Sequence, residues 1–383
     1  MSAITSLSGT ANQRVAALMA LLPRRDWLIM GWTVAIKFLL IFYGGKSFQV
    51  LQNQRPNGLY GWLELWNRWD SVHYQKLAEF GYEATDAIKT WFYPLLPWCV
   101  RLVAFVIRDY LVSGFVVSGI ALMAAAILLR RIVELDYPAR VALRSVWFLL
   151  IFPTAYFLHI SYTESLFLAL ALGCILCARR ERWWLAGGLG ALSCMTRAPG
   201  LMLVPTLAVE AIHQYWQTRR WQWRWLWIAI VPSGFGAYVL LNWYVTDDPL
   251  TFLRVRNGVF FSYSSWPWKG IENAIGNLNR EPCEAEMVAG QELFFIALGF
   301  VCAVVSWIKL RPLYATWITV NWVLVTSVSF VQSVPRYSLT MFPIFILFAL
   351  AGTSRFWNAV LTVWSLLFLA LFSSLFCWGH WAF

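Results

Sequence analysis

Two acidic side chains stand in stretches of sequence where charge is rare. Asp70 lies in "WNRWDSVHY", residues 66–74, and Glu164 follows "HISYT", residues 159–163. A carboxylate can take a proton from a hydroxyl as a general base, or it can orient hydroxyls by accepting their hydrogen bonds. We predict that Asp70 is a general base and that Glu164, together with Tyr162, orients hydroxyls of a substrate.

Two arginines lie where apolar segments are interrupted by proline. Arg197 is in "TRAPGL" and Arg336 is in "VPRYSL". A guanidinium binds phosphate through planar, bidentate hydrogen bonds, so we predict that both arginines bind a phosphate group. Tyr337, next to Arg336, is expected to line the same pocket. Three further side chains are predicted to contact substrate: Arg68, His73 and His159.

Each of these residues also has a structural interpretation. Asp70 precedes "SVHYQKLAEF" and would be a good N-cap for a helix there. Glu164 could be an anchor that bonds to a backbone end or to a neighbouring arginine. Arg197 and Arg336 could extend to lipid headgroups while their aliphatic stems stay in the bilayer. The sequence leaves these alternatives open.

The segments that must position these residues are typical of a polytopic membrane protein. Of the 383 residues, 60% are hydrophobic and 13% are charged, and the mean hydropathy is +0.60. A membrane span takes about 20 mainly apolar residues. We therefore expect an all-α fold, with residues 1–383 forming a single integral membrane domain. Eleven segments qualify as spans: 26–45, 111–129, 141–158, 161–178, 183–196, 198–216, 225–245, 290–308, 313–331, 337–353 and 356–378.

The segment 91–108 decides which side of the membrane each loop occupies. It is long enough to cross, but it contains two prolines and Arg101. If it lies in the membrane interface instead, the side that holds the N-terminus carries sixteen Lys or Arg residues and five Asp or Glu residues. Short loops then obey the rule that cytoplasmic loops are positively charged. We therefore interpret 91–108 as interfacial.

With this topology, every candidate residue falls on the non-cytoplasmic side. Two large loops lie on that side. The loop 46–110 contains Asp70 and is expected to form short helices along the membrane surface, and the loop 246–289 could cover the site. The sequence thus predicts one site that opens outward.

Other classes of function find little support in the sequence. The net charge of +11 is spread over short loops and forms no single basic face, which argues against nucleic acid binding. There is no D-x-D motif, no pair of histidines four residues apart, and no glycine pattern of a nucleotide-binding loop. We therefore expect neither a metal nor another cofactor.

Five stretches, in this order, resemble the motifs of the PIG-V type mannosyltransferase family, which includes the enzyme that adds the second mannose to GPI anchors: "RWDSVHY", "FYPLLP", "FPTAYFLHISYTESLFLAL", "TRAPG" and "VPRYSLTMFPIF". The resemblance covers residues 60 to 345. It implies the GT-C glycosyltransferase fold, an essential carboxylate in the first outer loop, and a polyprenyl-phosphate-linked sugar as donor, which in eukaryotes is dolichyl-phosphate mannose. One departure is Arg197-Ala198-Pro199-Gly200, where the family often has R-S-N-G.

The expected function is transfer of a sugar, most simply mannose, from a polyprenyl-phosphate donor to a hydroxyl of a glycolipid or glycan acceptor. The brevity of the chain favours a bacterial inner membrane, and in a eukaryote the membrane would be the endoplasmic reticulum. A secondary transporter or flippase for an anionic lipid-linked substrate is the alternative, although no internal repeat of the kind common in transporters is visible. A purely structural assembly subunit would leave the polar motifs without a role.

Overall fold

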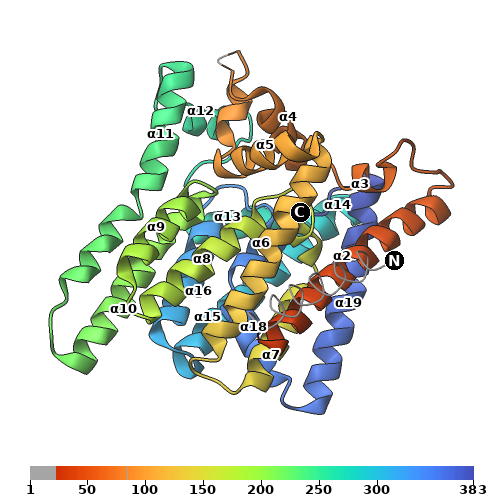
Figure 1. Cartoon of the computed structure of the whole chain (residues 1–383). Coiled ribbons are helices and arrows are strands. Elements are labelled where there is room, and N and C mark those ends of the chain that lie inside the picture. Colours follow the sequence, from red (N-terminus) through yellow and green to blue (C-terminus); the bar gives the residue numbers. More distant parts are fainter. Residues whose placement is uncertain (1–22, 84) are drawn as a thin grey trace, which may run out of the picture.

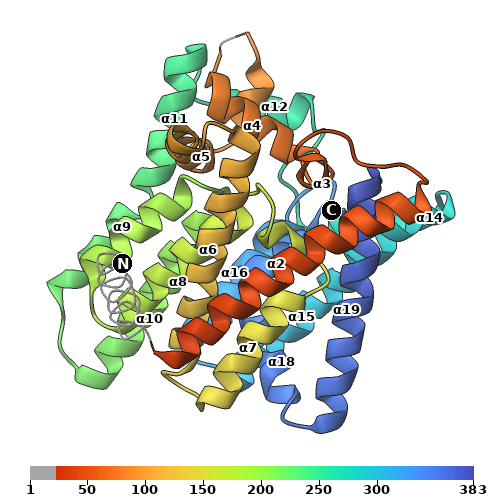
Figure 2. The same ribbon diagram turned by 45° about the vertical axis from the view of Figure 1, so that its right-hand side comes forward.

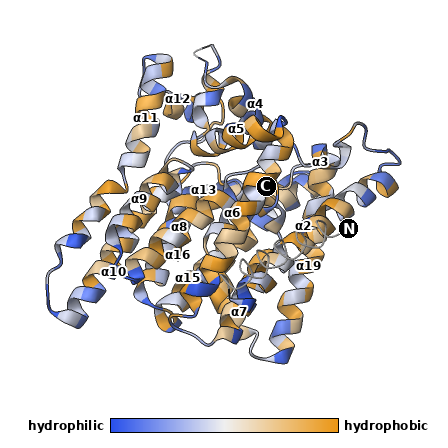
Figure 3. Ribbon diagram, in the orientation of Figure 1, coloured by the Kyte–Doolittle hydropathy of each residue, from blue (hydrophilic) through white to orange (hydrophobic). Residues whose placement is uncertain are grey.

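The chain folds into helices, as the hydropathy pattern predicts. The computed structural model describes residues 23–83 and 85–383. Within these residues the regular elements are helices, with one isolated β-bridge between Ser264 and Val328. Figure 3 shows apolar residues along the helices and hydrophilic residues mainly near their ends. The expected all-α class is therefore confirmed.

Five helical stretches of the described chain are long and apolar enough to cross a membrane. A sixth is added if α17 with its following turn, Val334–Thr340, and α18, Pro343–Ala351, count as one span bent by 84°. The expected number of eleven spans is thus not confirmed. The five stretches are α2 (Arg24–Leu51), α6 (Tyr110–Val133), η4 with α11 (Trp223–Thr246), α14 with η6 and α15 (Pro282–Lys309), and α19 (Arg355–Trp378).

The remaining expected spans are shorter helices because polar motifs interrupt them. Pro153 follows the end of one of these helices, and "TRAPG" follows the end of another. Hydropathy averaged over a window of residues counts the apolar residues on both sides of such a break, but it does not detect the break itself. These shorter helices are α7 (Ala139–Ile151), α8 (Glu164–Arg179), α9 (Trp183–Cys194), α10 (Leu203–Thr218) and α16 (Pro312–Thr326).

The arginine-rich hinges gather at one end of the molecule, the lower end in Figure 1. Buried or half-buried carboxylates hold them together, because a buried carboxylate needs a cationic partner. Four ion pairs join segments that are far apart in sequence: Asp26 with Arg130 at 2.6 Å, Asp26 with Arg131 at 2.8 Å, Asp136 with Arg179 at 2.7 Å, and Glu210 with Arg311 at 2.8 Å.

The large loops lie at the opposite end. Helix α2 continues to Leu51, so the first loop begins six residues later than expected. This loop contains α3 (Gly61–Glu64), α4 (Asp70–Phe80), η1 (Ala87–Trp91) and α5 (Leu95–Ile107). The second loop contains α12 (Thr251–Gly258), α13 (Pro267–Gly276), η5 (Asn277–Asn279), α14 (Pro282–Ala285) and the π-helical turn η6 (Glu286–Gly290).

Helix α5 does not cross the bundle. Its first residue, Leu95, donates its N–H to the carbonyl of Met195 just beyond α9 at 3.1 Å, and its other end leads directly into α6. Both ends therefore lie on the side of the first loop, where α5 packs against α4 and α6 (Figure 2). Arg101, which made a span doubtful, donates to the carbonyl of Ala78 at 2.6 Å, near the end of α4.

Candidate functional site

Asp70 is the first residue of α4, and its side chain points away from that helix. Trp69, the residue before it, has a left-handed φ of +48°, and its ring packs against Phe376 at 5.0 Å between centroids. The Asp70 carboxylate accepts a hydrogen bond from Nη1 of Arg336 at 2.7 Å. No side-chain cap bond is present at the start of α4. The interpretation of Asp70 as a helix cap is therefore wrong.

Glu164 begins α8 and is fully buried. Its Oε1 atom accepts hydrogen bonds from Nη1 of Arg197 at 2.5 Å and from Nε of Arg336. Its other oxygen, Oε2, has no partner among the described residues. Glu164 is thus bonded to two arginines, as the anchor interpretation proposed, and still has one oxygen free to accept a hydrogen bond.

Aromatic rings hold the two guanidinium groups in place. The guanidinium of Arg336 lies 4.6 Å from the ring centre of Tyr162 and 5.0 Å from that of Phe157, and that of Arg197 lies 4.8 Å from the ring centre of Tyr337. Such contacts stabilise a cation over the face of a ring. The side chains of Arg336 and Arg197 are only 8% and 9% exposed. They do not extend to lipid headgroups, so that alternative is also wrong.

The network Asp70–Arg336–Glu164–Arg197, here called the charge cluster, contains two carboxylates and two guanidiniums. It brings together residues from α4, α8, the turn after α9, and α17. No described residue accepts a hydrogen bond from Nη2 of Arg336, or from Nε and Nη2 of Arg197. These N–H groups are donors that an anion such as phosphate can use.

The tight turn after α9 places Arg197. Gly200 lies so close to the end of α9 that a Cβ atom there would be 2.6 Å from the backbone nitrogen of Cys194. A side chain at this position would therefore push the turn away from the helix. The glycine of "TRAPG" is required by this close approach, and it helps to set where Arg197 enters the charge cluster.

Glu292, on α15 (Gln291–Lys309), is a residue that the motifs missed. It is fully buried, and its two oxygens accept the backbone N–H groups of Ser333 at 2.6 Å and Val334 at 2.8 Å. These residues lead into α17 (Val334–Tyr337), which carries Arg336. The sequence did contain a signal for Glu292, because it is an acidic residue near the start of an apolar span. A carboxylate there is energetically costly and usually has a specific partner.

Arg68 lies outside the charge cluster. Its Nε donates to the carbonyl of Leu65 at 3.0 Å, and its Nη2 donates to the carbonyl of Cys377 at 2.8 Å. Its own carbonyl accepts the hydroxyl of Tyr162 at 2.8 Å. Arg68 thus ties the first large loop to α19 and, through its carbonyl, holds the hydroxyl of Tyr162.

The two candidate histidines are not bonded to the charge cluster either. His73 is half-buried and stacks on Phe92 at 4.7 Å between ring centroids. Burial lowers the pKa of His73 below its usual value, although Asp70 opposes this shift. His159 is buried, and neither of its ring nitrogens has a partner among the described residues.

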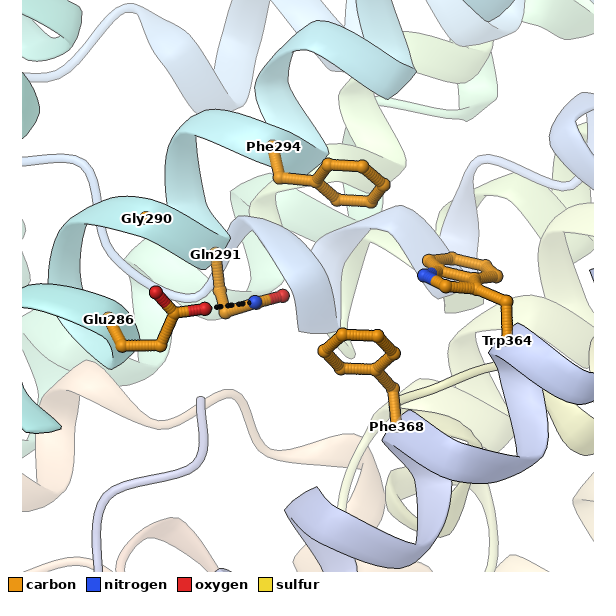
Figure 4. A pocket seen from close by; sticks show the side chains of 6 residues that line it. All are labelled: Glu286, Gly290, Gln291, Phe294, Trp364 and Phe368. Carbon is orange, nitrogen blue, oxygen red and sulfur yellow. Dashed lines mark hydrogen bonds between the residues drawn. The ribbon is translucent and has the colours of Figure 1, made fainter.

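Two cavities lie away from the charge cluster. One, of about 260 Å³, lies between the start of α15 and α19, where Glu286 bonds Gln291 below the ring of Phe294 (Figure 4). The other, of about 510 Å³, is an apolar groove between α10 and η4. Neither contains a predicted site residue. In residues 23–83 and 85–383, no group of three or more His, Cys, Asp or Glu is placed to hold a metal ion.

Comparison with protein families assigns the class. Residues 46–230 match the family described as Mannosyltransferase (PIG-V), and this range includes Asp70, Glu164 and Arg197. The helical membrane fold and this match define a membrane glycosyltransferase. Residues 46–230 are thus similar to the PIG-V mannosyltransferase family, as the motifs indicated. No curated protein gave a significant match.

Solved structures give only distant likenesses. The archaeal oligosaccharyltransferase AglB from Archaeoglobus fulgidus, in complex with an inhibitory peptide and a dolichol-phosphate, is 10% identical, with a TM-score of 0.46 over 90% of this chain. The apo form of the Archaeoglobus fulgidus oligosaccharyltransferase is also 10% identical, with a TM-score of 0.47 over 90% of this chain. The chain spans 56% of the length of each.

Proposed function

We propose that this glycosyltransferase moves mannose from a polyprenyl-phosphate donor to a hydroxyl of a glycolipid or other glycan acceptor. The observation that carries the proposal is the charge cluster, in which a candidate base, Asp70, is bonded to a candidate phosphate ligand, Arg336, at 2.7 Å. Sugar transfer from a lipid phosphate needs these two functions side by side: a base for the acceptor proton and cations for the departing phosphate.

Asp70 is the base in this proposal because it is the carboxylate of the cluster that an acceptor can reach. Its side chain is 34% exposed, whereas that of Glu164 is fully buried. The donor phosphate would take over the Nη1 group of Arg336 and leave the Asp70 carboxylate free. Asp70 then takes the proton of the acceptor hydroxyl as the oxygen attacks the sugar carbon in line, and the anomeric configuration inverts.

The phosphate leaves with an additional negative charge as the bond to the sugar breaks. The unoccupied N–H groups of Arg336 and Arg197 stabilise that charge, and side-chain cations of this kind act without a metal. Glu164 keeps both arginines in place through Oε1, and its buried, unpartnered Oε2 would accept a sugar hydroxyl only once donor binding opens a path to it. The ring of Tyr162, under the Arg336 guanidinium, holds the arginine in position for the phosphate.

The site faces the non-cytoplasmic side in this proposal. The arginine-rich hinges lie at the opposite end of the bundle, and positively charged loops favour the cytoplasm. The donor and acceptor would therefore be lipid-linked molecules of the outer leaflet of a bacterial inner membrane, or of the lumenal leaflet in a eukaryote.

The test uses purified protein in lipid nanodiscs, radiolabelled polyprenyl-phosphate mannose and a glycolipid extract as acceptor. Asp70→Asn is expected to abolish transfer while donor binding persists. Glu79→Gln, which changes an exposed carboxylate on the same helix, is the matched control and should transfer normally. Full turnover by Asp70→Asn would end the assignment of Asp70 as base.

A further inference from the structure

Arg336 is carried by a very short element that cannot hold its own position. Helix α17 has four residues, and the residue before it, Ser333, has a left-handed φ of +67°. A non-glycine residue adopts this conformation only at an energetic cost, so surrounding contacts must maintain it. The placement of the arginine therefore depends on what bonds to the backbone of residues 333–335.

Glu292 supplies two of these bonds. Its Oε1 accepts the N–H of Ser333, and its Oε2 accepts the N–H of Val334, so one carboxylate spans two successive amides just before Arg336. These two bonds satisfy buried backbone donors that would otherwise have no partner. A third bond, from Thr154 Oγ1 to the carbonyl of Pro335 at 2.8 Å, holds the other side of the segment.

The contacts of Glu292 separate it from the charge cluster. Its carboxylate is hydrogen-bonded to backbone amides and makes no ion pair with any described arginine or lysine. It is also fully buried, so a substrate cannot reach it. Its influence on the site must pass through the backbone of α17.

We propose that Glu292 is a positioning residue for donor recognition: by holding the start of α17, it sets the place at which Arg336 meets the lipid phosphate. This inference rests on the proposed function, which assigns Arg336 to the phosphate. A buried carboxylate with only a structural role would alter stability but not the affinity for phosphate.

The experiment measures binding of undecaprenyl phosphate to the full chain in nanodiscs, together with KM for donor and acceptor. Glu292→Gln is expected to weaken phosphate binding about tenfold and to raise the donor KM similarly, with the acceptor KM unchanged. Glu292→Asp keeps both carboxylate oxygens but on a shorter side chain. Its affinity for undecaprenyl phosphate should lie between those of the wild type and of Glu292→Gln. Hydrogen exchange should be faster in the peptide 327–340 of the Gln variant.

The matched control is Glu210→Gln. Glu210 is equally buried but pairs with Arg311 at the other end of the molecule, so its loss should lower the melting temperature without changing phosphate affinity. Wild-type phosphate affinity in a folded Glu292→Gln protein overturns the inference. If that variant does not fold, wild-type affinity in Glu292→Asp overturns it. Arg336→Gln separates the two proposals, because wild-type affinity in that variant overturns the proposed function as well.

Discussion

The four side chains of the charge cluster differ in their access to solvent, and this difference separates their roles. Asp70 is partly exposed, and the other three are buried. Arg336 is bonded to both carboxylates, so it is the one residue through which the base and the phosphate site are connected.

Replacing Arg336 should therefore cost more than replacing Arg197. Arg336→Gln leaves Asp70 without its partner and Glu164 with a single cation, and breaking a buried ion pair typically destabilises a protein by about 3–5 kcal/mol. We expect kcat/KM for the donor to fall by about 10² to 10³, the effect of losing one preorganised donor. Steady-state kinetics and thermal unfolding measure both effects. Unchanged donor affinity in both Arg336→Gln and Arg197→Gln would contradict their role in phosphate binding.

The lowered pKa of His73 predicts a dependence of stability on pH. Burial lowers its folded-state pKa below the unfolded value, so the unfolded chain takes up the proton first as pH falls. Its contribution is fully present above the unfolded pKa of about 6.5 and is lost as pH falls toward the folded pKa.

The melting temperature of the wild type should therefore fall further between pH 7.5 and pH 5 than that of His73→Phe. This variant keeps a ring for stacking on Phe92. His380→Phe, at an exposed position, is the control and should behave as wild type. An equal loss in wild type and His73→Phe would rule out this source of pH dependence.

The sequence singled out the four residues that the fold brings together in the charge cluster. Asp70, Glu164, Arg197 and Arg336 stand out because charge is rare around them, and the fold brings them together. Arg68, two residues before Asp70, was expected to assist at the site, but its guanidinium points away from the charge cluster and bonds backbone carbonyls. Glu292 contacts backbone amides, which leave no signature in the sequence of their own segment.

The elements that carry the charge cluster are short, and their positions depend on close backbone contacts. The turn after α9 is the clearest case, because Gly200 has no room for a Cβ atom. Gly200→Ala should destabilise the protein by about 1–3 kcal/mol, the usual effect of overpacking, and reduce transfer by displacing Arg197.

Gly188→Ala is the control for this change. Gly188 lies within α9 with no neighbouring atom within 4 Å of an added Cβ, so this variant should gain about 0.5–1 kcal/mol from helix propensity. Thermal unfolding and transfer assays compare the two variants. Equal stability and activity in both would mean that the close approach at Gly200 is not required.

Charge gave more information about the elements than hydropathy did. The distribution of arginines predicted that 91–108 does not cross, and in the structure both ends of α5 lie on the same side. Hydropathy alone predicted eleven spans, because the averaged hydropathy stays high across proline breaks such as that at Pro153. Where a helix stops depends on the tertiary contacts of the motif that follows it.

For the molecule as a whole, the two ends have opposite chemistry. One end holds ion-paired hinges rich in arginine, and the other holds the two large loops and the charge cluster. Cys283 in α14 is the exposed cysteine among those of the described residues, and it lies in the second large loop, which the proposed orientation places outside. A membrane-impermeant maleimide should label it in sealed right-side-out vesicles, and Cys283→Ser should remove the labelling. Labelling only in inside-out vesicles would reverse the proposed orientation.

The hydrogen bond between Asp70 and Arg336 has a consequence for kinetics. If Asp70 is the base, its Oδ2 atom is engaged by Arg336 before the donor binds, and this bond to a cation makes the carboxylate a weaker base for an acceptor that arrives first. Binding of the lipid phosphate to Arg336 would remove this effect. Substrates should therefore add in a fixed order, with the donor binding first.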